Sequence, residues 1–547
     1  MPTVHAAKKK RKPVVKKKKH ATAPKRHCKV VTRKVHGKKK RVKVCTPVKA
    51  KKKPPAKKPA RKPAGQPAGY KPTAPAFPPS TPVGPGAGPS PNPPADPSGS
   101  WTPPPAQPMS ALQAERLLWR AGFGPRPGDV ARFAAMGLDA AIAELVHPVG
   151  EPTLVGPAPH DGSGNALQPY DLWGHDHLWW LDRMVRSDQP LVERMALVWH
   201  DWFACSADKV QVDLMLGQNA LFRRAALGSF ANLLRDVTVD PAMLTFLDGI
   251  DNRKQSPNEN YAREVMELFT LGADRGAYTE DDIRQAAKAL TGWRCDYVDG
   301  VGFTNFRYDA TRHDTTTKTI FGQTGNFGWQ DVCTLCLQHP LHPSFFVTKL
   351  WSYFVPVAMD QPTQATLQAA YVTSGFQVAP VLELIFRHPV FLDGPAMVKP
   401  PVVANAGLLR GIGRYVDIDD WAYLGDQTGQ RLFYPPNVAG WDDARWMDTS
   451  TWCGRWHVTG VALQPSQVPT GAPSSYSDTE DGAGAVAAAA AAVGSPALTA
   501  ETQTKLKAFA DSALPATMNA TQKRTYRAMR QNALRLLIAT SADAQTC

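Results

Sequence analysis

The distribution of charge and proline divides this chain into an arm that cannot form a packed core and a body that can. Residues 1–100 contain 28 Lys and Arg but one acidic residue, Asp96, and 24 of the 50 prolines lie in residues 1–108. Such a segment buries too little apolar surface to offset the entropy lost on ordering. The whole chain carries +17 and residues 1–100 carry +27, so residues 101–547 carry 17 − 27 = −10. The basic pI therefore belongs to the arm, and it does not indicate a nucleic-acid-binding fold.

The arm consists of a Lys-rich block, residues 1–72, and a linker rich in Pro, Gly and Ser, residues 73–108. Charge repulsion and proline stiffness predict that it is disordered and extended. We expect the arm to bind an anionic polymer or surface, with a strong salt dependence because counterions are released. The alternative is a solubilising spacer that binds nothing. No aromatic residues alternate with the lysines, so specific nucleic-acid recognition is not expected.

Three further features of the sequence concern location. Cys28 and Cys45 flank a Val-containing stretch of the Lys-rich block, and they predict a small disulfide-closed loop in an oxidising compartment. No apolar run follows the lysines after Met1, so no secretory signal is visible there. No segment approaches the ~20 apolar residues of a membrane span, so we expect no transmembrane segment. Two locations remain open: the cell envelope or extracellular space, if the true start lies upstream, and the cytoplasm.

Residues 109–547 are long enough for one large domain, and helical periodicity dominates them. Strand-like alternation is confined to 303–308 and 318–322, which together predict one small hairpin. Residues 464–500 are rich in Gly, Ala, Ser and Pro and predict a flexible insertion before a last helical pair. The expected fold class is mostly α: a large multi-helix domain with at most a small β hairpin, preceded by the disordered basic and Pro-rich arm.

The segment 257–272, with the sequence PNENYAREVMELFTLG, is the strongest candidate for a functional element. Pro257 and Asn258 are helix start signals, and Gly272 is a stop signal. At about 100° per residue, one face of this helix is polar and the other is an apolar stripe. A solvated acidic face remains the alternative to a site, because carboxylates near a first turn also suit the helix dipole. The polar face consists of Asn260, Arg263, Glu264 and Glu267.

Two His-Asp pairs, His200-Asp201 and His313-Asp314, add donor types that bind Zn, Mn or Fe. Together with Glu259 they define the candidate ligands of a divalent metal, which is the cofactor that we expect if there is a site. Their spacing matches no ligand signature such as His-Glu-x-x-His. The alternative is an ordinary interhelix histidine at position 200, with the carboxylates paired to arginines. The candidate catalytic residues are Glu264, Glu267 and Arg263, and the candidate binding residues are Asn258, Asn260, Trp293, Arg294 and Trp441.

Two other motifs are less specific. Cys333 and Cys336 form a Cys-x-x-Cys pair without a second pair or a thioredoxin-like context, so we expect a structural disulfide or two free thiols. Residues 433–441, FYPPNVAGW, predict a rigid loop that either packs in the core or lines a groove for a sugar or a peptide. No phosphate-binding loop and no nucleophile elbow is present in the sequence.

The motifs occur in an order that resembles the bacterial family called domain of unknown function 1800, over about residues 110–547. Asp201-Trp202 and Asp442 depart from the usual pattern of that family. The resemblance implies no activity, because none is established for the family, but it favours export, since members commonly bear export signals. The matching segments are 117–124, 193–203, Ser206, 209–210, 218–219, 240–243, 247–248, 257–272, 278–280, 289–294, 313–314, Lys318, 349–350, 399–400, 433–441 and Trp446.

Three hypotheses follow. The first is an envelope-associated or exported helical protein of unknown activity, with a metal-assisted hydrolytic site in which a free Glu acts as general base on metal-bound water. The second is a non-catalytic binding or assembly module whose charged residues form a structural network. The third is a cytoplasmic protein bound to nucleic acid through its basic arm. The sequence alone identifies neither a substrate nor a protein partner.

Overall fold

The structure is a computed structural model. The chain divides into two compact units, residues 1–90 and residues 91–547, and each is described by itself. Most of the predicted arm and linker lies outside the described residues, so their predicted disorder stays a prediction. The structure describes residues 26–35, 38–47, 101–103, 108–470 and 480–547.

The Lys-rich block contains an antiparallel hairpin, made of β1 (Arg26–Val35) and β2 (Lys38–Pro47). Its register places Cys28 directly opposite Cys45. Directly opposed residues of an antiparallel pair have their Cα atoms about 4.5–5.5 Å apart, which is within the range that a disulfide requires. The backbone is therefore compatible with the predicted disulfide-closed loop, and the disulfide itself stays a prediction.

The second unit is built around α5 (Pro190–Trp202), whose residues are all buried except Asp201. A helix that is buried on nearly every side lies in the interior of a large domain, and the charged side chains of α5 are held there by partners from other elements. Three neighbours pack directly on it, α3 (Leu138–Val146), α4 (His175–Arg186) and α6 (Val212–Arg224), and α16 (Pro401–Ile412) packs on α4. This centre holds large buried aromatic rings, including Trp180, Trp199 and Trp202.

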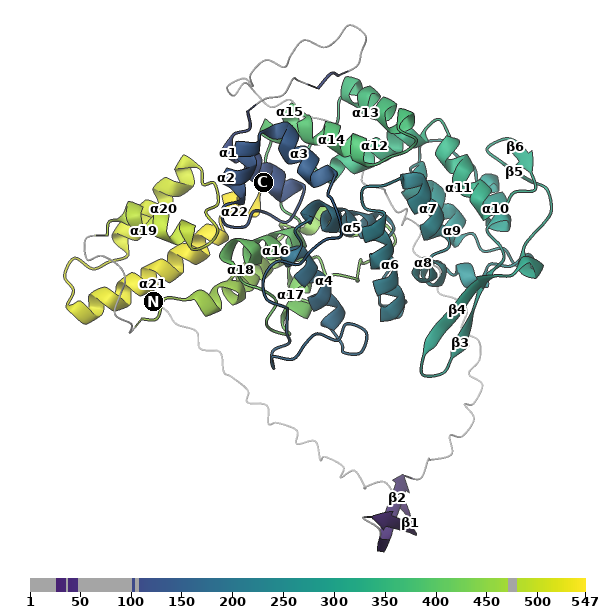
Figure 1. Ribbon diagram of the computed structural model, residues 1–547, viewed down its shortest axis with the longest axis horizontal. Coiled ribbons are helices and arrows are strands. Elements are labelled where there is room, and N and C mark those ends of the chain that lie inside the picture. The colour runs from purple at the N-terminus through teal and green to yellow at the C-terminus, as the bar shows by residue number, and fades with distance from the viewer. Residues whose placement is uncertain (1–25, 36–37, 48–100, 104–107, 471–479) are drawn as a thin grey trace, which may run out of the picture. The chain divides into compact units, whose positions relative to one another are not determined.

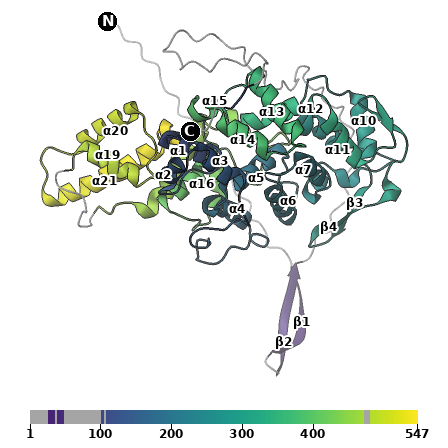
Figure 2. The same ribbon diagram turned by 45° about the horizontal axis from the view of Figure 1, so that its top comes forward.

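The remaining helices surround this centre, and the mostly α fold class is confirmed (Figures 1 and 2). Many of these helices have a side-chain cap at their N-terminus, such as the capping boxes at Ser110 and Thr279. None of the described helices is long and apolar enough to cross a membrane. The helices are α1 (Ala111–Arg120), α2 (Asp129–Met136), α3 (Leu138–Val146), α7 (Phe230–Thr238), α8 (Pro241–Phe246), α10 (Glu280–Ala289), α11 (Trp329–Gln338), α12 (His342–Ser352), α13 (Gln361–Thr373), α14 (Ala379–Arg387), α15 (Pro389–Asp393), α17 (Trp421–Gln427) and α18 (Thr449–Leu463).

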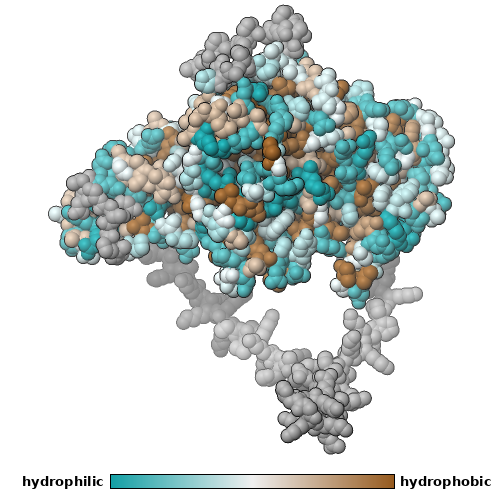
Figure 3. Space-filling view, in the orientation of Figure 1, coloured by the Kyte–Doolittle hydropathy of each residue, from teal (hydrophilic) through white to brown (hydrophobic). Residues whose placement is uncertain are grey.

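Two short hairpins lie in the second unit. β3 (Trp293–Val298) pairs with β4 (Gly302–Tyr308), and β5 (Lys318–Ile320) pairs with β6 (Gln323–Gly325). The two strands predicted from the sequence therefore do not pair with each other, because each turns back on its nearest neighbour through a tight turn. Tyr297 and Val301, near the tip of β3–β4, are more than half exposed, and this tip is a hydrophobic spot on the surface (Figure 3).

The carboxy-terminal helices α19 (Gly482–Ala491), α20 (Ala500–Ser512) and α21 (Ala520–Ala539) form a small core of their own at one end of the unit (Figure 1). The first of them lies inside the segment predicted to be a flexible insertion. It is helical because alanine has the highest helix propensity, and its Ala485 and Ala489 are fully buried. The chain then returns to the main body through α22 (Ala542–Gln545).

Candidate functional site

The segment 257–272 is not one regular helix. It begins as α9 (Asn260–Glu264) and continues as the π-helical segment η2 (Val265–Thr270). Its predicted apolar face is buried at Tyr261, Val265 and Phe269, and Gly272, with φ at +89°, ends it as predicted. The π-helical turn was not predicted, because six residues are too few for a sequence to distinguish the two helical periods. Such turns occur frequently at functional sites.

The wider turn presents backbone carbonyls to side chains from other helices. Lys349 Nζ, on α12, donates to the Leu268 carbonyl at 2.9 Å. Trp202 Nε1, at the end of α5, donates to the Phe269 carbonyl at 3.1 Å. The segment 257–272 is therefore the point at which α5 and α12 are held together.

Arg263 organises the polar face of this segment. Its guanidinium donates to Glu280 at 2.9 and 2.8 Å, and it contacts Glu267 at 3.3 Å and Glu259 at 3.4 Å. These side chains are partly exposed, so each pair contributes about 0–1 kcal/mol to stability. At this face three carboxylates, Glu259, Glu267 and Glu280, therefore pair with one arginine.

Glu264 differs from its neighbours. Burial, followed by the negative charge of Glu267, raises its pKa to about 7, although Arg263 opposes the shift. Tyr278 lies next to Glu267, and burial raises the pKa of this phenol as well. Two carboxyl groups, Glu264 with its raised pKa and Glu267, thus stand side by side on the predicted catalytic face. This is the pattern that general acid–base pairs show.

Asn258 and Asn260 support a turn and do not point into a cavity. The backbone N–H of Asn260 donates to Asn258 Oδ1 at 2.9 Å, and its side-chain amide donates to Asp248 Oδ2 at 3.1 Å. Asp248 has a positive φ of 57° and pairs with Lys209 at 2.7 Å. The two predicted binding asparagines therefore hold a strained loop in place.

His200 lies in an aromatic enclosure. Its ring is 5.3 Å from that of Trp180, 5.7 Å from Phe433 and 5.5 Å from Trp441, between ring centroids. Burial lowers its pKa to about 3, so the imidazole is neutral. Its Nε2 has no hydrogen-bond partner among the described residues.

Asp201, the next residue, fixes the loop 433–441. One of its oxygens accepts the backbone N–H of Trp441 at 2.7 Å, and the other accepts the Tyr353 hydroxyl at 2.7 Å. Burial raises its pKa, and these two hydrogen bonds oppose that effect. Gly440, with φ at +94°, makes the close approach possible, since a Cβ there would lie 2.2 Å from Asp201 Oδ1.

The second His-Asp pair has different surroundings. His313 Nδ1 lies 2.9 Å from the Thr291 carbonyl, and its ring packs against Tyr308. Asp314 accepts from the backbone and the hydroxyl of Thr316 and lies near Lys318 Nζ, at 3.8 Å. On the adjoining β3, Arg294 pairs with Asp309 at 3.2 Å, and Trp293 packs against Tyr308 and Trp329.

The predicted metal ligands are therefore not assembled. His200 contacts rings and His313 contacts backbone, and the two pairs share no partner. The part of the chain that the structure describes contains no group of three or more His, Cys, Asp or Glu that could hold a metal ion. The donor set of these predicted ligands therefore does not fit a resident metal. Cys333 and Cys336 are buried free thiols, as one of the two alternatives predicted.

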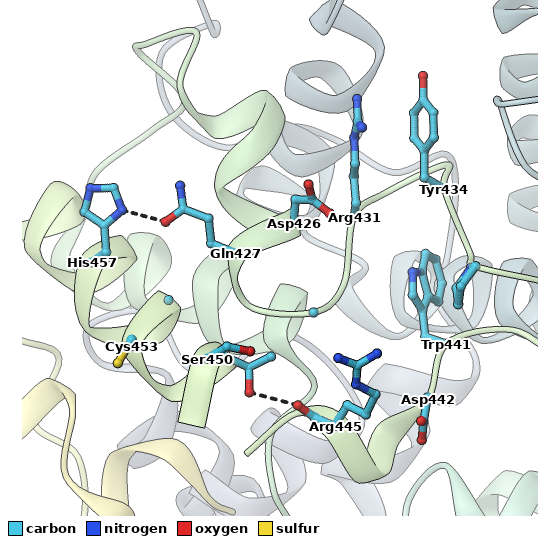
Figure 4. A pocket seen from close by; sticks show the side chains of 14 residues that line it. Asp426, Gln427, Arg431, Tyr434, Trp441, Asp442, Arg445, Ser450, Cys453 and His457 are labelled. Atoms are coloured by element: carbon cyan, nitrogen blue, oxygen red, sulfur yellow. Dashed lines mark hydrogen bonds between the residues drawn. The ribbon is translucent and has the colours of Figure 1, made fainter. Parts of the chain in front are cut away.

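Two cavities meet at Trp441. The first, which we call the outer cleft, has a volume of about 710 Å³ and is formed by α17, α18 and the loop 433–441. Figure 4 shows Arg431, Tyr434 and Trp441 on one of its sides and Gln427 and His457 on another. The second, the inner cavity, has about 180 Å³. It is lined by Arg194, Asp201, Lys349, Tyr353, Trp441 and Trp446, among others.

Two cations line the inner cavity. Burial lowers the pKa of Lys349 to about 8 and that of Arg194 to about 10. Both donate to backbone carbonyls: Lys349 to Leu268, and Arg194 to Arg120 and Tyr353, at 3.4 and 3.3 Å. Neither forms an ion pair within the described part of the chain. The negative charge of Asp201 attracts Lys349 and opposes the lowering of its pKa, although the two side chains do not form an ion pair.

The same cavity contains unsatisfied donors. The indole N–H groups of Trp441 and Trp446 are buried and have no acceptor among the described residues. A buried donor without a partner costs about 1–3 kcal/mol. The inner cavity therefore combines two cations that donate only to backbone carbonyls with two tryptophans whose N–H groups lack an acceptor among the described residues.

A family model described as "Protein of unknown function (DUF1800)" matches residues 116–545. The chain belongs to this family. Among the curated proteins and among the solved structures, no protein matches. The match covers both cavities and the segment 257–272 of the DUF1800 domain, and it leaves the Lys-rich block outside.

Sequence reasoning found some residues of this site and missed others. Trp441 is a predicted binding residue, and Asp201 is a candidate for another role, that of a metal ligand. Lys349 was noticed only as part of the family resemblance, and Arg194 only as a partner for carboxylates. Tyr353 carries no signal of its own, because a tyrosine near the end of an amphipathic helix is usually part of the core.

Proposed function

We propose that this DUF1800 protein is a ligand-binding protein of the cell envelope, and that its ligand is an acidic saccharide. The sugar enters the outer cleft, and its carboxylate lies in the inner cavity. The observation that carries the proposal is the pair Lys349 and Arg194, two desolvated cations that line one small cavity and form no ion pair among the described residues, although Asp201 and Asp443 line the same cavity. A buried charge without a partner is costly, and a ligand anion offsets that cost.

The cavity dimensions support a ligand with one acidic ring. A cavity of about 150 Å³ is known to take one six-membered ring. The inner cavity, at about 180 Å³, is of that size, and the outer cleft offers room for further residues of a polymer. Trp441 lies between the two and gives a flat apolar face, which suits the face of a sugar ring.

The location is proposed on two grounds. The Lys-rich block is suited to acidic polymers of the envelope, and the family resemblance favours export. An acidic saccharide carries the negative charge that the Lys-rich block and the inner cavity are each suited to bind. The charged network around Arg263 is then structural, which agrees with the hypothesis of a binding module.

Calorimetric titration tests this proposal. The probe is a glucuronic-acid tetrasaccharide, and a neutral glucose tetrasaccharide is the comparison. We expect the acidic probe to bind, Lys349→Gln to weaken it at least tenfold, and Lys505→Gln to leave it unchanged, because Lys505 is exposed and lies on α20. The melting temperature of Lys349→Gln is measured alongside, since this residue also holds η2. Equal affinity of the wild-type protein for the two probes contradicts the proposal. So does equal affinity of Lys349→Gln and Lys505→Gln for the acidic probe.

A second candidate function rests on Glu264. A carboxyl group with a pKa of about 7 donates and accepts protons readily at neutral pH, and Glu267 and Arg263 stand beside it. This favours a hydrolytic activity in which Glu264 is the general acid or base. The check is a screen of chromogenic glycosides and esters. An activity that Glu264→Gln retains in full excludes a catalytic role for this residue.

A further inference from the structure

A third cavity, of about 720 Å³, lies apart from the Trp441 cavities and has none of their lining residues. It is bounded by the loop after α3, by α4, by the beginning of α5 and by the end of α6. We call it the arginine cavity. Its charged lining residues are Arg183, Arg223, Arg224, His147 and Glu151.

The buried carboxylate of Glu193 holds two of the arginines that line the arginine cavity. Glu193 lies in the first turn of α5 and its side chain has an exposed fraction of 0%. Its carboxylate accepts from Arg183 Nε at 2.8 Å and from Arg223 Nε and Nη2 at 2.6 and 2.9 Å. Arg223 also donates to Asn219 at 2.7 Å. Two guanidinium groups are thus fixed in orientation before any ligand arrives.

Aromatic packing holds the same two groups. The guanidinium carbons of Arg183 and Arg223 lie 5.6 and 5.3 Å from the ring centre of Trp179. Arginine stacked on an aromatic ring keeps its outer N–H groups free for a planar or tetrahedral oxoanion. Neither side chain is fully buried, with exposed fractions of 17% and 12%, so both remain accessible from the cavity.

The charges of this site do not cancel. Two arginines share one carboxylate, which leaves 2 − 1 = +1, and the exposed Arg224 adds one further positive charge. The opposing groups are Glu151, which is exposed at the cavity, and Glu383, which is already paired with His147 at 2.6 Å. The beginning of α5 adds to the attraction for an anion, because no side chain caps it and its Gln189 and Val192 line the cavity.

We propose that the arginine cavity binds a phosphate group carried by a small molecule or by a polymer. Phosphate presents several acceptor oxygens in different directions, and arginine forks match that geometry. A carboxylate has only two oxygens, and Glu193 already supplies one such acceptor group to Arg183 and Arg223 from beneath. The proposal is independent of the saccharide site, because the two share no residue.

Thermal melting of the full chain in pyrophosphate tests the proposal. Melting reports on the folded domain, so binding of pyrophosphate to the Lys-rich block, which belongs to a separate unit, does not contribute. At about ten times Kd, we expect pyrophosphate to raise the melting temperature by about 1–3 °C relative to chloride at equal ionic strength. Inorganic phosphate and glycerol phosphate then distinguish free phosphate from a phosphorylated ligand.

Variants decide whether the arginine cavity is responsible. Arg224→Gln should at least halve the rise, and Arg224→Lys should lose less of it, because the charge remains. Arg132→Gln is the matched control, since this exposed arginine of α2 pairs with Glu144 and does not line the cavity. No rise in the wild-type protein, or an equal rise in Arg224→Gln, overturns the proposal. Because Arg224 is exposed, its replacement leaves the buried Glu193 network intact.

Discussion

Asp201 accepts a hydrogen bond from the backbone amide of Trp441 at 2.7 Å, and this contact joins the last turn of α5 to the loop 433–441. The partner oxygen of Asp201 accepts the Tyr353 hydroxyl, so one carboxylate connects three separate parts of the chain. The ring of Trp441 lies where the outer cleft meets the inner cavity. The shape of both cavities therefore depends on Asp201, whose two oxygens each accept one hydrogen bond from another part of the chain, and Asp201 positions the site.

Gly440→Ala should destabilise the domain by about 2–4 kcal/mol, because φ is positive there and the new Cβ would overlap Asp201 Oδ1. Gly413→Ala is the matched control, with φ at +68° and open space around the position. It should cost only about 1 kcal/mol, the penalty of the left-handed backbone. Urea unfolding measures both. Equal losses in the two variants would mean that the contact with Asp201 contributes nothing.

Binding of the acidic saccharide should weaken above pH 8. The pKa of Lys349 is about 8, so its ammonium is largely protonated at pH 7 and largely neutral at pH 9. A bound carboxylate favours the protonated form, and we expect about tenfold weaker binding at pH 9 than at pH 7. Lys349→Arg keeps its charge throughout this range and should abolish the dependence. A loss of the same size in that variant would assign the pH effect to another group.

The sequence predicted what depends on local periodicity. The spacing of Tyr261, Val265, Leu268 and Phe269 indicates a buried face; three of these side chains are buried, and Leu268 is partly exposed. The contacts that form the site are of another kind. Lys349 and Leu268 are 81 positions apart, and Asp201 and Trp441 are 240 apart. No local pattern records such pairs, because they depend on how the helices pack and not on which face of each is apolar.

Glu264 should make the domain less stable as the pH rises from 4.5 to 7. Its pKa is raised from 4.5 to about 7 in the folded protein, so the folded state holds a proton that the unfolded state releases in this range. The contribution is fully present below pH 4.5 and is lost as the pH rises through 7. Glu264→Gln should therefore be more stable than the wild-type protein at pH 8, by about 1 kcal/mol after allowance for partial exposure. Urea unfolding at pH 5 and pH 8 measures the difference, which should vanish at pH 5 if other effects of the amide are small.

Cys28 and Cys45 should form a disulfide in protein isolated from an oxidising compartment. The hairpin register pairs them directly, and a disulfide across an antiparallel pair needs no shift of the backbone. Non-reducing proteolysis with mass spectrometry should yield one cross-linked peptide. Cys28→Ser, treated identically, provides the uncrosslinked reference. Two free thiols in the protein isolated from its native compartment would contradict both the disulfide and the proposed envelope location.

Acid sensitivity and EDTA treatment distinguish a packing role of His200 from a metal-binding role. Burial lowers the pKa of His200 from 6.5 to about 3, so the unfolded chain binds a proton at pH values where the folded protein does not. Stability is fully present above pH 6.5 and is lost as the pH falls toward 3, by about 2–3 kcal/mol between pH 6.5 and 4.5. His200→Phe, which preserves the aromatic enclosure, should lose this part of the acid sensitivity. EDTA should leave the melting temperature of the wild-type protein unchanged. If EDTA lowered the melting temperature of the wild-type protein and not that of His200→Phe, His200 would be a metal ligand. Packing in the aromatic enclosure would then be its second role.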